Sequence, residues 1–359
     1  QTVDLGKPLR VLDLCGAPGG KSTHIQTLIS PDSLLVSNEI IKSRSKIIVD
    51  NIVKWGAPNV VVTNNDPVDF QDLPGFFDVV VVDAPCSGSG LFRKAENAIQ
   101  EWSQNNVVLC SQRQQRILAD VLLALKQNGI LIYSTCSYSK EEDEDIADWL
   151  VEKFRMENVN LEVNKNWGIV ESYASKTKSI CYRFYPDKLK GEGFYLACFR
   201  KGGESYQHNY SQSKVQNVTA AEKKILTPWI KTEGLSFYKK HSNIFALPQS
   251  FTELFSILQS TLQVIYAGID VGEVVREKFI PHHALALSTI VSNDVPSIKL
   301  NYADAIKYLQ KQNLQVDLNR SGWQLVSYQD HNLGWVNALH NRINNYYPKE
   351  LRILKRHDN

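Results

Sequence analysis

Several features are scarce or absent in this chain of 359 residues. No apolar run approaches the roughly 18 residues that a membrane helix requires, and no charged start precedes an apolar core as in a secretory signal. The six cysteines have no paired short spacings, which argues against a disulfide scaffold and a zinc site. There is no internal repeat. We therefore expect a cytoplasmic protein with reduced thiols, no membrane partner and no bound metal.

Charge of one sign is scarce as well, because the formal net charge is only +2. Beyond residue 202, however, basic residues outnumber acidic ones, which suggests an anionic partner for the C-terminal part. With 43% hydrophobic residues, a chain of this length can bury two separate cores. We expect a monomer.

The first third alternates between two kinds of pattern. Apolar stretches at 10–14, 34–39 and 59–63 predict strands, and helices are predicted at 22–29 and 42–55 between them. This alternation predicts an α/β fold with a doubly wound parallel sheet.

Two later strands each deliver a cysteine to the end of the sheet. Val79 to Val82 form an unbroken β-branched run that ends at Asp83-Ala-Pro-Cys86, and a second apolar strand ends at Cys136. An unbroken apolar run suits a strand covered on both faces, and ligands of parallel sheets collect at the carboxyl ends of strands. Chemistry is expected there, although each loop taken alone could be structural with an inert thiol.

The remaining elements of this region follow from turn and capping signals. A helix is predicted over 106–127, stopped by Gly129, and a capping box at Ser139 to Glu142 predicts a helix start. Residues 181–184 and 194–200 predict an antiparallel hairpin.

These patterns divide the chain into a sheet domain over 1–202, a polar linker over 203–222 and an α+β region over 223–359. The last region has expected strands at 243–247, 262–268 and 323–328, and expected helices at 252–262 and 302–310.

The first glycine turn and four acids indicate the ligand. The turn is neither G-x-G-x-x-G nor a P-loop, which disfavours a dinucleotide or a nucleotide triphosphate. The expected strands end in Asp13, Glu39, Asp66 and Asp83. Four carboxylates suit a ligand with a ribose, an adenine amine and an α-amino group, and S-adenosylmethionine has all three.

Three motifs resemble, in order and spacing, the signatures of the Nop/Sun family of RNA cytosine-C5 methyltransferases: Cys15-Gly-Ala-Pro-Gly-Gly-Lys21, Asp83-Ala-Pro-Cys86-Ser-Gly-Ser-Gly and Ser134-Thr-Cys136-Ser-Tyr-Ser. Within that family the chain most resembles the bacterial RsmF-like small-subunit rRNA methyltransferases, on the stretches Arg183-Phe-Tyr-Pro186, Gly191-Glu-Gly-Phe194, Gly334-Trp335 and Asn341-Arg-Ile-Asn-Asn-Tyr-Tyr-Pro348. Family members carry an RNA-binding segment and one more cofactor motif before the first strand. Because the chain starts at Gln1 almost directly on that strand, an upstream segment is expected to be missing from it.

The resemblance implies a Rossmann-like S-adenosylmethionine-dependent methyltransferase sheet followed by a PUA-like RNA-binding module, and methylation of a cytosine in small-subunit (16S) rRNA or in the assembled subunit. C5 of cytosine is a poor nucleophile, so a thiolate must first add to C6. By resemblance Cys136 is that nucleophile, Asp83 holds cytosine N3, and Cys86 assists product release. A thiol is mostly protonated at neutral pH, so Cys136 requires surroundings that favour its thiolate.

The resemblance also implies the binding residues. The cofactor residues would be Cys15, Gly16, Ala17, Pro18, Gly19, Gly20, Lys21, Glu39, Asp66 and Asp83. Basic candidates for RNA are Lys21, Arg44, Arg342, Lys349, Arg352, Lys355 and Arg356. Aromatic candidates for stacking on RNA bases are Trp323, Tyr328, Tyr346 and Tyr347, whereas Trp335 is expected in the core. The other cysteines, Cys110, Cys181 and Cys198, are expected to be core thiols.

Other functions remain open at this point. A tRNA cytosine-C5 methyltransferase would carry the same motifs, and a non-catalytic RNA-binding assembly factor could keep the fold. A Rossmann dehydrogenase is disfavoured by the turn and by the paired cysteines. Amino-directed methyltransferases prefer Asp/Asn-Pro-Pro-aromatic where this chain has Asp83-Ala-Pro-Cys86.

Overall fold

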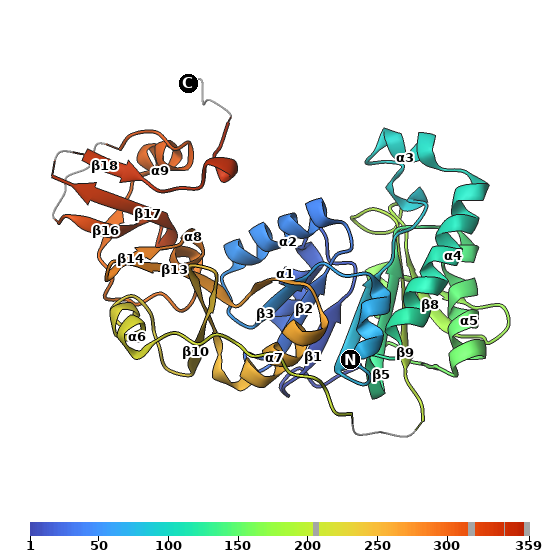
Figure 1. Cartoon of the computed structure of the whole chain (residues 1–359). Coiled ribbons are helices and arrows are strands. Elements are labelled where there is room, and N and C mark those ends of the chain that lie inside the picture. The colour runs from blue at the N-terminus through green and yellow to red at the C-terminus, as the bar shows by residue number, and fades with distance from the viewer. Residues whose placement is uncertain (204–207, 315–319, 341, 355–359) are drawn as a thin grey trace. The chain divides into compact units, whose positions relative to one another are not determined.

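The computed structural model describes residues 1–203, 208–314, 320–340 and 342–354 (Figure 1). The chain packs into two compact units whose segments interleave: residues 1–49, 61–213 and 257–266 form the first, and residues 50–60, 214–256 and 267–359 the second. The division expected at 202 and 223 stays a prediction, and two short segments, 50–60 and 257–266, pack with the unit on the other side of it.

The first unit is built on one mixed sheet, with strand order β12-β3-β2-β1-β4-β5-β9-β8-β7 and with β6 paired to β9. β1 pairs in parallel with β2 and β4, and β4 with β5, whereas β9 lies antiparallel beside β5. The strands are β1 (Arg10–Asp13), β2 (Leu34–Asn38), β3 (Val60–Thr63), β4 (Phe77–Asp83), β5 (Leu125–Thr135), β6 (Glu157–Asn158), β7 (Val170–Tyr173), β8 (Ile180–Phe184), β9 (Phe194–Arg200) and β12 (Val264–Ala267). The predicted hairpin is therefore present as β8 and β9.

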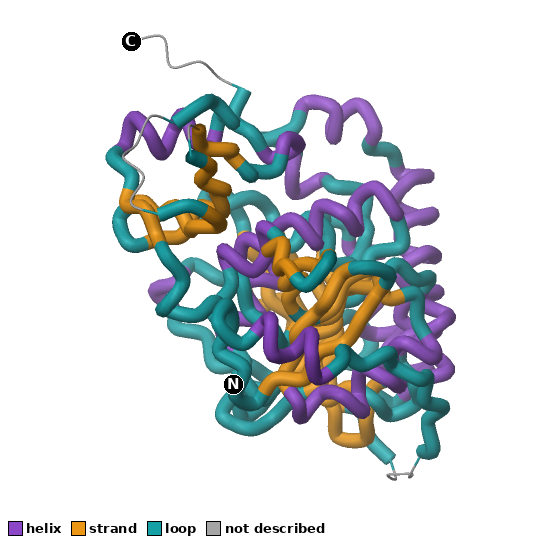
Figure 2. Tube along the Cα trace, turned by 60° about the vertical axis from the view of Figure 1, so that its left-hand side comes forward, coloured by secondary structure: helices purple, strands orange, loops and turns teal. Residues whose placement is uncertain are grey.

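Helices lie on both sides of these strands (Figure 2). They are α1 (Gly20–Leu28), α2 (Lys42–Trp55), α3 (Glu96–Glu101), α4 (Gln104–Val121), α5 (Glu144–Phe154) and α7 (Thr252–Thr261). α2 has the predicted bounds, and α1 begins two residues before the predicted residue 22.

The strand order reverses between β1 and β4, because β2 and β3 lie on one side of β1 while β5 lies beyond β4. The loops after β1 and β4 therefore leave the sheet in opposite directions, and a crevice opens between them at the carboxyl ends of the strands. β4 is buried in the sheet: Val79 to Val82 are each at most 8% exposed, which confirms the predicted coverage on both faces.

The helix predicted over 106–127 is too long at its C-terminal end. α4 stops at Val121, and Leu125 already pairs with Phe77 as the first residue of β5. Gly129 is not a helix cap but lies inside that strand, where a Cβ would be 3.0 Å from Asp78 O and 2.8 Å from Lys126 O. The apolar stripe did not reveal the end of the helix, because Leu125 would be buried both in a longer helix and in the strand that it begins.

The capping box predicted at Ser139 is absent. Residues Lys140–Glu142 form a short 3-10 turn, the Ser139 side chain makes no cap hydrogen bond, and α5 begins only at Glu144. Glu142 points inward and is fully buried. The acidic run does lead into a helix, but the carboxylate of Glu142 binds the loops of the site described below instead of capping that helix.

Stretch 262–268 was predicted as a strand of the C-terminal part. It forms β12 at the edge of the first sheet, beside β3, and Asn64 N donates to Gln263 O at 3.1 Å just before that pairing. Sequence pattern alone does not reveal which sheet an isolated short strand joins.

The second unit contains two four-stranded sheets, in the orders β10-β11-β13-β14 and β15-β16-β17-β18. Its strands are β10 (Leu235–Lys240), β11 (Asn243–Pro248), β13 (Ile269–Val275), β14 (Lys278–Pro281), β15 (Ser297–Lys299), β16 (Gly322–Tyr328), β17 (His331–Leu339) and β18 (Arg342–Asn345). Its helices are α6 (Ala220–Leu226), α8 (His283–Leu287) and α9 (Tyr302–Leu309). Trp335 is 1% exposed, as expected for a core residue, and its indole N–H donates to His282 O.

Candidate active site

The turn after β1 brings backbone close to the crevice. Gly16 N donates to Asn38 O (2.8 Å), and Gly19 N donates to Gly16 O (2.7 Å). Gly19 has φ 111°, a left-handed conformation that favours glycine. A Cβ on Gly16 would lie 2.4 Å from Ser37 Oγ, so any other residue there forces the turn or the buried Ser37 side chain to shift.

Asp13, at the end of β1, is fully buried beneath this turn. Ser22 Oγ donates to Asp13 Oδ2 at 2.6 Å, while Oδ1 has no hydrogen-bond partner among the described residues. Burial raises the pKa of Asp13 to about 6, because an ionised carboxylate loses its hydration there.

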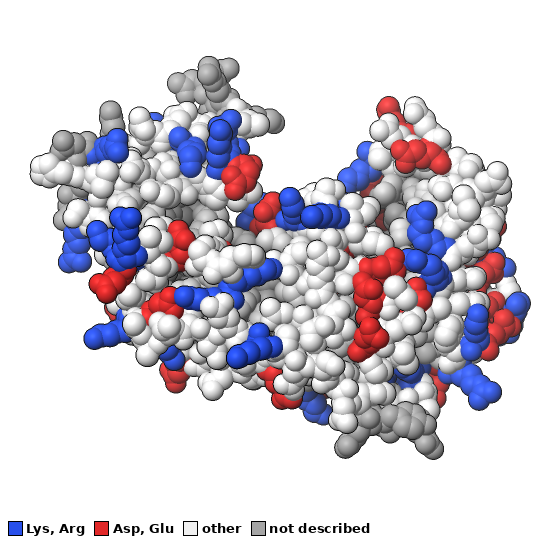
Figure 3. Space-filling model, in the orientation of Figure 1, with Lys and Arg blue, Asp and Glu red and all other residues white. Residues whose placement is uncertain are grey.

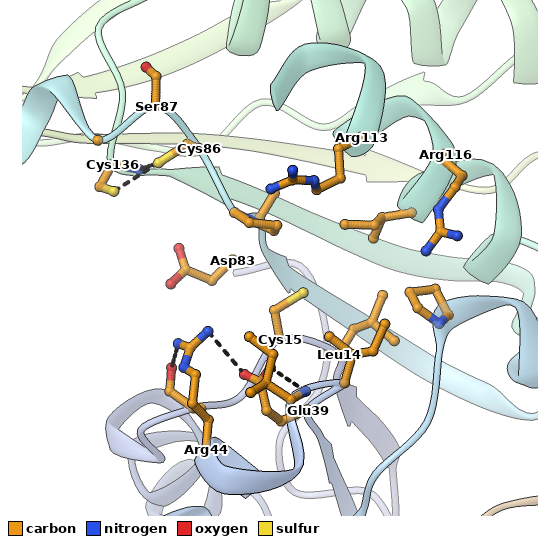
Figure 4. Close-up of a pocket in the computed structure, with 18 of the residues that line it drawn as sticks. Leu14, Cys15, Glu39, Arg44, Asp83, Cys86, Ser87, Arg113, Arg116 and Cys136 are labelled. Carbon is orange, nitrogen blue, oxygen red and sulfur yellow. Dashed lines mark hydrogen bonds and ion pairs between the residues drawn. The ribbon is translucent and has the colours of Figure 1, made fainter. Parts of the chain in front are cut away.

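Glu39 follows β2 and is only 4% exposed. Its Oε1 accepts from Ile41 N (3.0 Å), and its Oε2 is 3.5 Å from Arg44 Nη1. Arg44 Nη2 also donates to Ala17 O, so the arginine connects the β2 loop to the glycine turn. Figure 4 shows Arg44 and Glu39 side by side along one wall.

Asp66, in the loop after β3, does not line the pocket itself but is paired with Arg116, which does. Its Oδ1 accepts from Val68 N at 3.2 Å, and Arg116 of α4 donates to both carboxylate oxygens at 3.1 and 2.9 Å. The neighbouring Pro67, rather than Asp66, lines the pocket.

Asp83 ends β4 opposite the glycine turn and points into the pocket (Figure 4). Lys21 Nζ lies 2.6 Å from its Oδ2, and Ser134 Oγ donates to its Oδ1 at 2.9 Å. Lys21 also lies over the Phe194 ring, 5.6 Å from the centroid. Asp83 is therefore held by one residue from α1 and one from β5.

Cys86 and Cys136 point toward one another, with 2.8 Å between their sulfurs (Figure 4). Cys136 N also donates to Cys86 Sγ at 3.3 Å. The hydrogen bond from Cys86 lowers the pKa of Cys136. The same hydrogen bond, together with burial, raises the pKa of Cys86, because a second thiolate beside the first is unfavourable. The geometry thus favours one thiolate on Cys136, with the shared proton kept on Cys86.

Backbone hydrogen bonds join the two cysteine loops on both sides of this pair. Ala84 N donates to Ser134 O (2.8 Å) before the cysteines, and Gly90 N donates to Cys136 O (2.8 Å) after them. Gly193 N then donates to Gly90 O, which brings the start of β9 against the same loops.

These residues surround a pocket of about 900 Å³. Of the predicted site residues, the pocket is lined by Cys15, Ala17, Glu39, Arg44, Asp83, Cys86 and Cys136. Lys21 reaches it through Asp83, whereas Gly16, Pro18, Gly19, Gly20 and Asp66 do not line it. The apolar part of the wall includes Leu14, Ile40, Pro67, Leu109 and Ile117.

Sequence reasoning missed several residues that shape the pocket. Asn38 is buried and joins three loops: its Nδ2 donates to Leu14 O and Asn65 O, and its Oδ1 accepts from Thr63 Oγ1 and Asn65 N. Arg113 of α4 also lines the pocket. An asparagine at the end of a buried strand was a usable signal, whereas nothing in the pattern of α4 identified Arg113.

The described residues fit S-adenosylmethionine. The pocket combines carboxylates for a ribose and an ammonium group with apolar walls for an adenine. Glu39 and Asp83 would hold the cofactor, which supplies a methyl group as a good electrophile.

The predicted RNA-binding residues of the second unit lie at the surface where they are described. Arg342, Lys349 and Arg352 are exposed, whereas Lys355 and Arg356 lie outside the described residues. Trp323 packs edge-on against Tyr346 at 4.3 Å, and Tyr346 is 45% exposed. Figure 3 shows Lys and Arg side chains among Asp and Glu side chains on the face drawn, so the basic excess does not form one uniform field there.

The remaining predicted core thiols are packed inside the protein. Cys110, Cys181 and Cys198 are buried, and burial raises the pKa of Cys181 to about 12 and that of Cys198 to about 11. Among the described residues, no three His, Cys, Asp or Glu side chains gather to hold a metal ion. Within the same residues, no helix has the length and apolar character needed to cross a membrane.

The doubly wound sheet, the glycine turn after β1, the acid after β2 and the crevice at the switch point define an S-adenosylmethionine-dependent methyltransferase. Residues 2–200 match the family described as 16S rRNA methyltransferase RsmB/F, and residues 295–353 match the Methyltransferase RsmF PUA domain. The chain belongs to the 16S rRNA methyltransferase RsmB/F family. The expected enzyme class, an RNA (cytosine-C5) methyltransferase, is confirmed at the level of the family, and so are the cofactor and the C-terminal PUA-like domain.

Two relatives carry the name ribosomal RNA small subunit methyltransferase F. The protein from Psychromonas ingrahamii is 29% identical over 95% of this chain and 73% of its own length. The protein from Shewanella denitrificans is 30% identical over 96% of this chain and 76% of its own length. Among solved structures, NSun6 from Pyrococcus horikoshii is 26% identical, with a TM-score of 0.48 over 55% of this chain and 48% of that chain.

Proposed function

We propose that this protein methylates C5 of a cytosine in small-subunit rRNA through a covalent adduct between Cys136 and C6 of the base. The observation that carries the proposal is the pair of thiols, 2.8 Å apart beside Asp83 in the cofactor pocket. Methyl transfer to an amino or hydroxyl group, which is itself a nucleophile, does not require a thiol that adds to the substrate.

Cys136 is proposed to begin the reaction. Its thiolate adds to C6, and electron density moves toward N3 and C5, so that C5 becomes nucleophilic. The lowered pKa of Cys136 supports this role, because a larger fraction is thiolate at neutral pH. Asp83, oriented by Lys21 and Ser134, is proposed to hydrogen-bond cytosine N3 and stabilise the adduct.

Cys86 is proposed to assist the second half of the reaction. After methylation C5 gives up its proton to solvent water, the electron pair of that C–H bond forms the C5–C6 double bond, and the bond between C6 and Cys136 Sγ breaks with its electron pair returning to sulfur. Cys86 lies next to the departing sulfur, and a hydrogen bond donated to it stabilises the thiolate as it forms.

The substrate is proposed to be unpaired or flipped out, since C6 of a stacked base is inaccessible. The PUA-like domain is proposed to supply affinity through its exposed basic side chains. Charge reversal at Lys349 and Arg352 is then expected to weaken RNA binding and to flatten its salt dependence; unchanged binding would discard that surface. A monomeric state, an assembled subunit as substrate and a cytoplasmic location stay predictions.

The decisive experiment measures transfer of labelled methyl from S-adenosylmethionine to small-subunit rRNA, with tRNA as the competing substrate. Wild type is expected to methylate rRNA, Cys136→Ala is expected to be inactive, and Cys86→Ala is expected to accumulate a covalent RNA adduct. Turnover by Cys136→Ala would refute the nucleophile. Methylation of tRNA alone would favour the tRNA enzyme, and no methylation of either RNA would favour an assembly factor.

A further inference from the structure

A single buried carboxylate lies behind both cysteines. Glu142 Oε1 accepts from Ser87 N (2.7 Å), and its Oε2 accepts from Ser87 Oγ (2.5 Å) and Ser137 Oγ (2.6 Å). Ser87 directly follows Cys86, and Ser137 directly follows Cys136. One side chain therefore binds the residue after each of the two thiols.

A third contact extends this cluster to α4. Gln114 Nε2 donates to Glu142 Oε1 at 3.3 Å and to Pro85 O at 3.0 Å, so the residue before Cys86 is held as well. Tyr133 OH donates to Glu142 O at 2.6 Å and fixes the backbone that carries the carboxylate. The charge of Glu142 is thus matched by several neutral donors in a fully buried position.

We infer that Glu142 is a positioning residue that holds Cys86 against Cys136, so that the second thiol acts promptly on the adduct made by the first. The inference rests on the proposed function, because it assigns the step that Glu142 serves. It differs from a role in folding alone, since the backbone hydrogen bonds from Ala84 and Gly90 already join the same loops beyond the cysteines.

Loss of the carboxylate should therefore change the distance between the thiols more than the course of the loops. In Glu142→Gln one acceptor oxygen becomes an NH2 donor. If it replaces Oε2, Ser87 Oγ and Ser137 Oγ must accept from it instead of donating, and their O–H groups lose the oxygen that they share. Ser87 then loses an acceptor, and Cys86 is released from its contact with Cys136. Addition of Cys136 to C6 is slowed but still possible, because Cys136 and Asp83 remain, whereas release of the product needs both thiols.

The test compares Glu142→Gln with Glu141→Gln, which neutralises the preceding acid on the same turn. Glu141 accepts from Gln104 Nε2 at the surface and touches neither cysteine loop through its carboxylate, so it controls for loss of charge. The full chain is assayed for methyl transfer to small-subunit rRNA, for the fraction of protein that runs as an RNA adduct in denaturing gels, and for the rate of Cys136 alkylation against pH.

Glu142→Gln is expected to bind S-adenosylmethionine like wild type, to lose at least tenfold in turnover and to accumulate adduct. The alkylation profile of Cys136 is expected to move to higher pH, because loss of the hydrogen bond from Cys86, the largest influence on the pKa of Cys136, outweighs loss of the Glu142 charge, which by itself raises that pKa. A purely structural role would not produce this shift. If Glu142→Gln fails to fold, Ser87→Ala removes one of the three close donors without changing charge, and the same effects are expected in smaller degree. Behaviour equal to that of Glu141→Gln, or joint loss of cofactor binding and adduct formation in a variant that folds, would overturn the inference.

The proposed function fails in a different way. Turnover by Cys136→Ala, or absence of methylation by wild type, would remove the reaction itself and would not depend on Glu142. If the wild-type enzyme is active and Glu142→Gln releases its RNA adduct at the normal rate, only the positioning role is refuted.

Discussion

At the scale of single residues, the site depends on which of two thiols keeps a proton. Cys86 donates a hydrogen bond to Cys136, and this lowers the pKa of Cys136 below the ordinary thiol value. A thiol with a lowered pKa is ionised over a wider range of pH, so alkylation by iodoacetamide should already be fast near neutral pH. In Cys86→Ala the donor is gone, so the alkylation profile of Cys136 is expected to shift to higher pH, with a lower rate at pH 7.

The measurement is the rate of Cys136 labelling, read by peptide mass spectrometry across pH 6–10. Cys110→Ala is a suitable control, because that buried thiol lies on α4 and outside the pocket lining. A profile for Cys86→Ala equal to that of wild type would show that the hydrogen bond does not set the ionisation of Cys136.

The same 2.8 Å contact makes the thiol pair a target for oxidants. Hydrogen peroxide is expected to convert Cys136 to a sulfenic acid with release of water, and Cys86 then to displace a second water and form a disulfide. Both sulfurs are oxidised and the peroxide oxygens are reduced, so activity should be lost and then restored by dithiothreitol. Intact mass should fall by two hydrogens in wild type. Cys86→Ala should instead gain oxygen and recover poorly; a disulfide elsewhere in wild type would contradict the prediction.

At the scale of elements, the conformation of the turn between β1 and α1 depends on Gly16 more than on Gly20. Gly16→Ala would place a Cβ 2.4 Å from Ser37 Oγ, 3.1 Å from Ser22 Oγ and 3.3 Å from Asp13 Oδ2. Either the turn moves away from β2 or the buried hydrogen bonds among Ser37, Ser22 and Asp13 rearrange, and affinity for S-adenosylmethionine is expected to fall at least tenfold by calorimetry. Gly20→Ala is the matched control, because nothing lies within 4 Å of its Cβ position. Equal affinity in the two variants would show that the close approach at Gly16 is unimportant for binding.

Elements with strong local signals were predicted from sequence, and those that depend on tertiary pairing were not. The short run of β-branched residues in β4 favours a strand buried on both faces, and the amphipathic pattern of Lys42–Trp55 favours a helix; both were placed correctly. The end of α4 was misplaced because Leu125 suits a helix stripe and a buried strand equally. β12 was assigned to the wrong sheet because its partner β3 lies about 200 residues away in the chain, and residue patterns do not encode that pairing.

The site follows the same rule. Cys86, Cys136, Asp83 and Glu39 were found because their chemistry and their places at strand ends are visible in the sequence. Asp66 was predicted by the same argument; it does not line the pocket itself but pairs with Arg116 of α4, which does. Glu142 was taken for a helix cap because an acidic run suits a helix start. The structure turns its side chain inward, and no local pattern reports the direction of a single side chain.

At the scale of the whole molecule, the two units are expected to respond to acid in opposite directions. Burial raises the pKa of Asp13 in the first unit to about 6, and it lowers the pKa of His283 in the second unit to about 4. Asp13 binds its proton more tightly when folded, so its contribution to stability is present at low pH and is lost as pH rises through about 6. His283 is neutral when folded, so its contribution is present above about 6.5 and is lost as pH falls toward 4.

Each shift corresponds to about 3 kcal/mol between the extremes of its range. Amide hydrogen exchange at pH 7.5 and pH 5, corrected for intrinsic exchange rates, measures the local stability of both units in one sample. From pH 7.5 to pH 5, protection of β17 should fall in wild type, and it should fall less in His283→Asn, which cannot protonate. That comparison isolates His283 from Asp270, whose raised pKa in the same unit acts in the opposite direction. Protection of β1 should rise in wild type and stay level in Asp13→Asn, which keeps the acceptor for Ser22. A common loss in both units, unaltered by either substitution, would assign acid sensitivity to other groups.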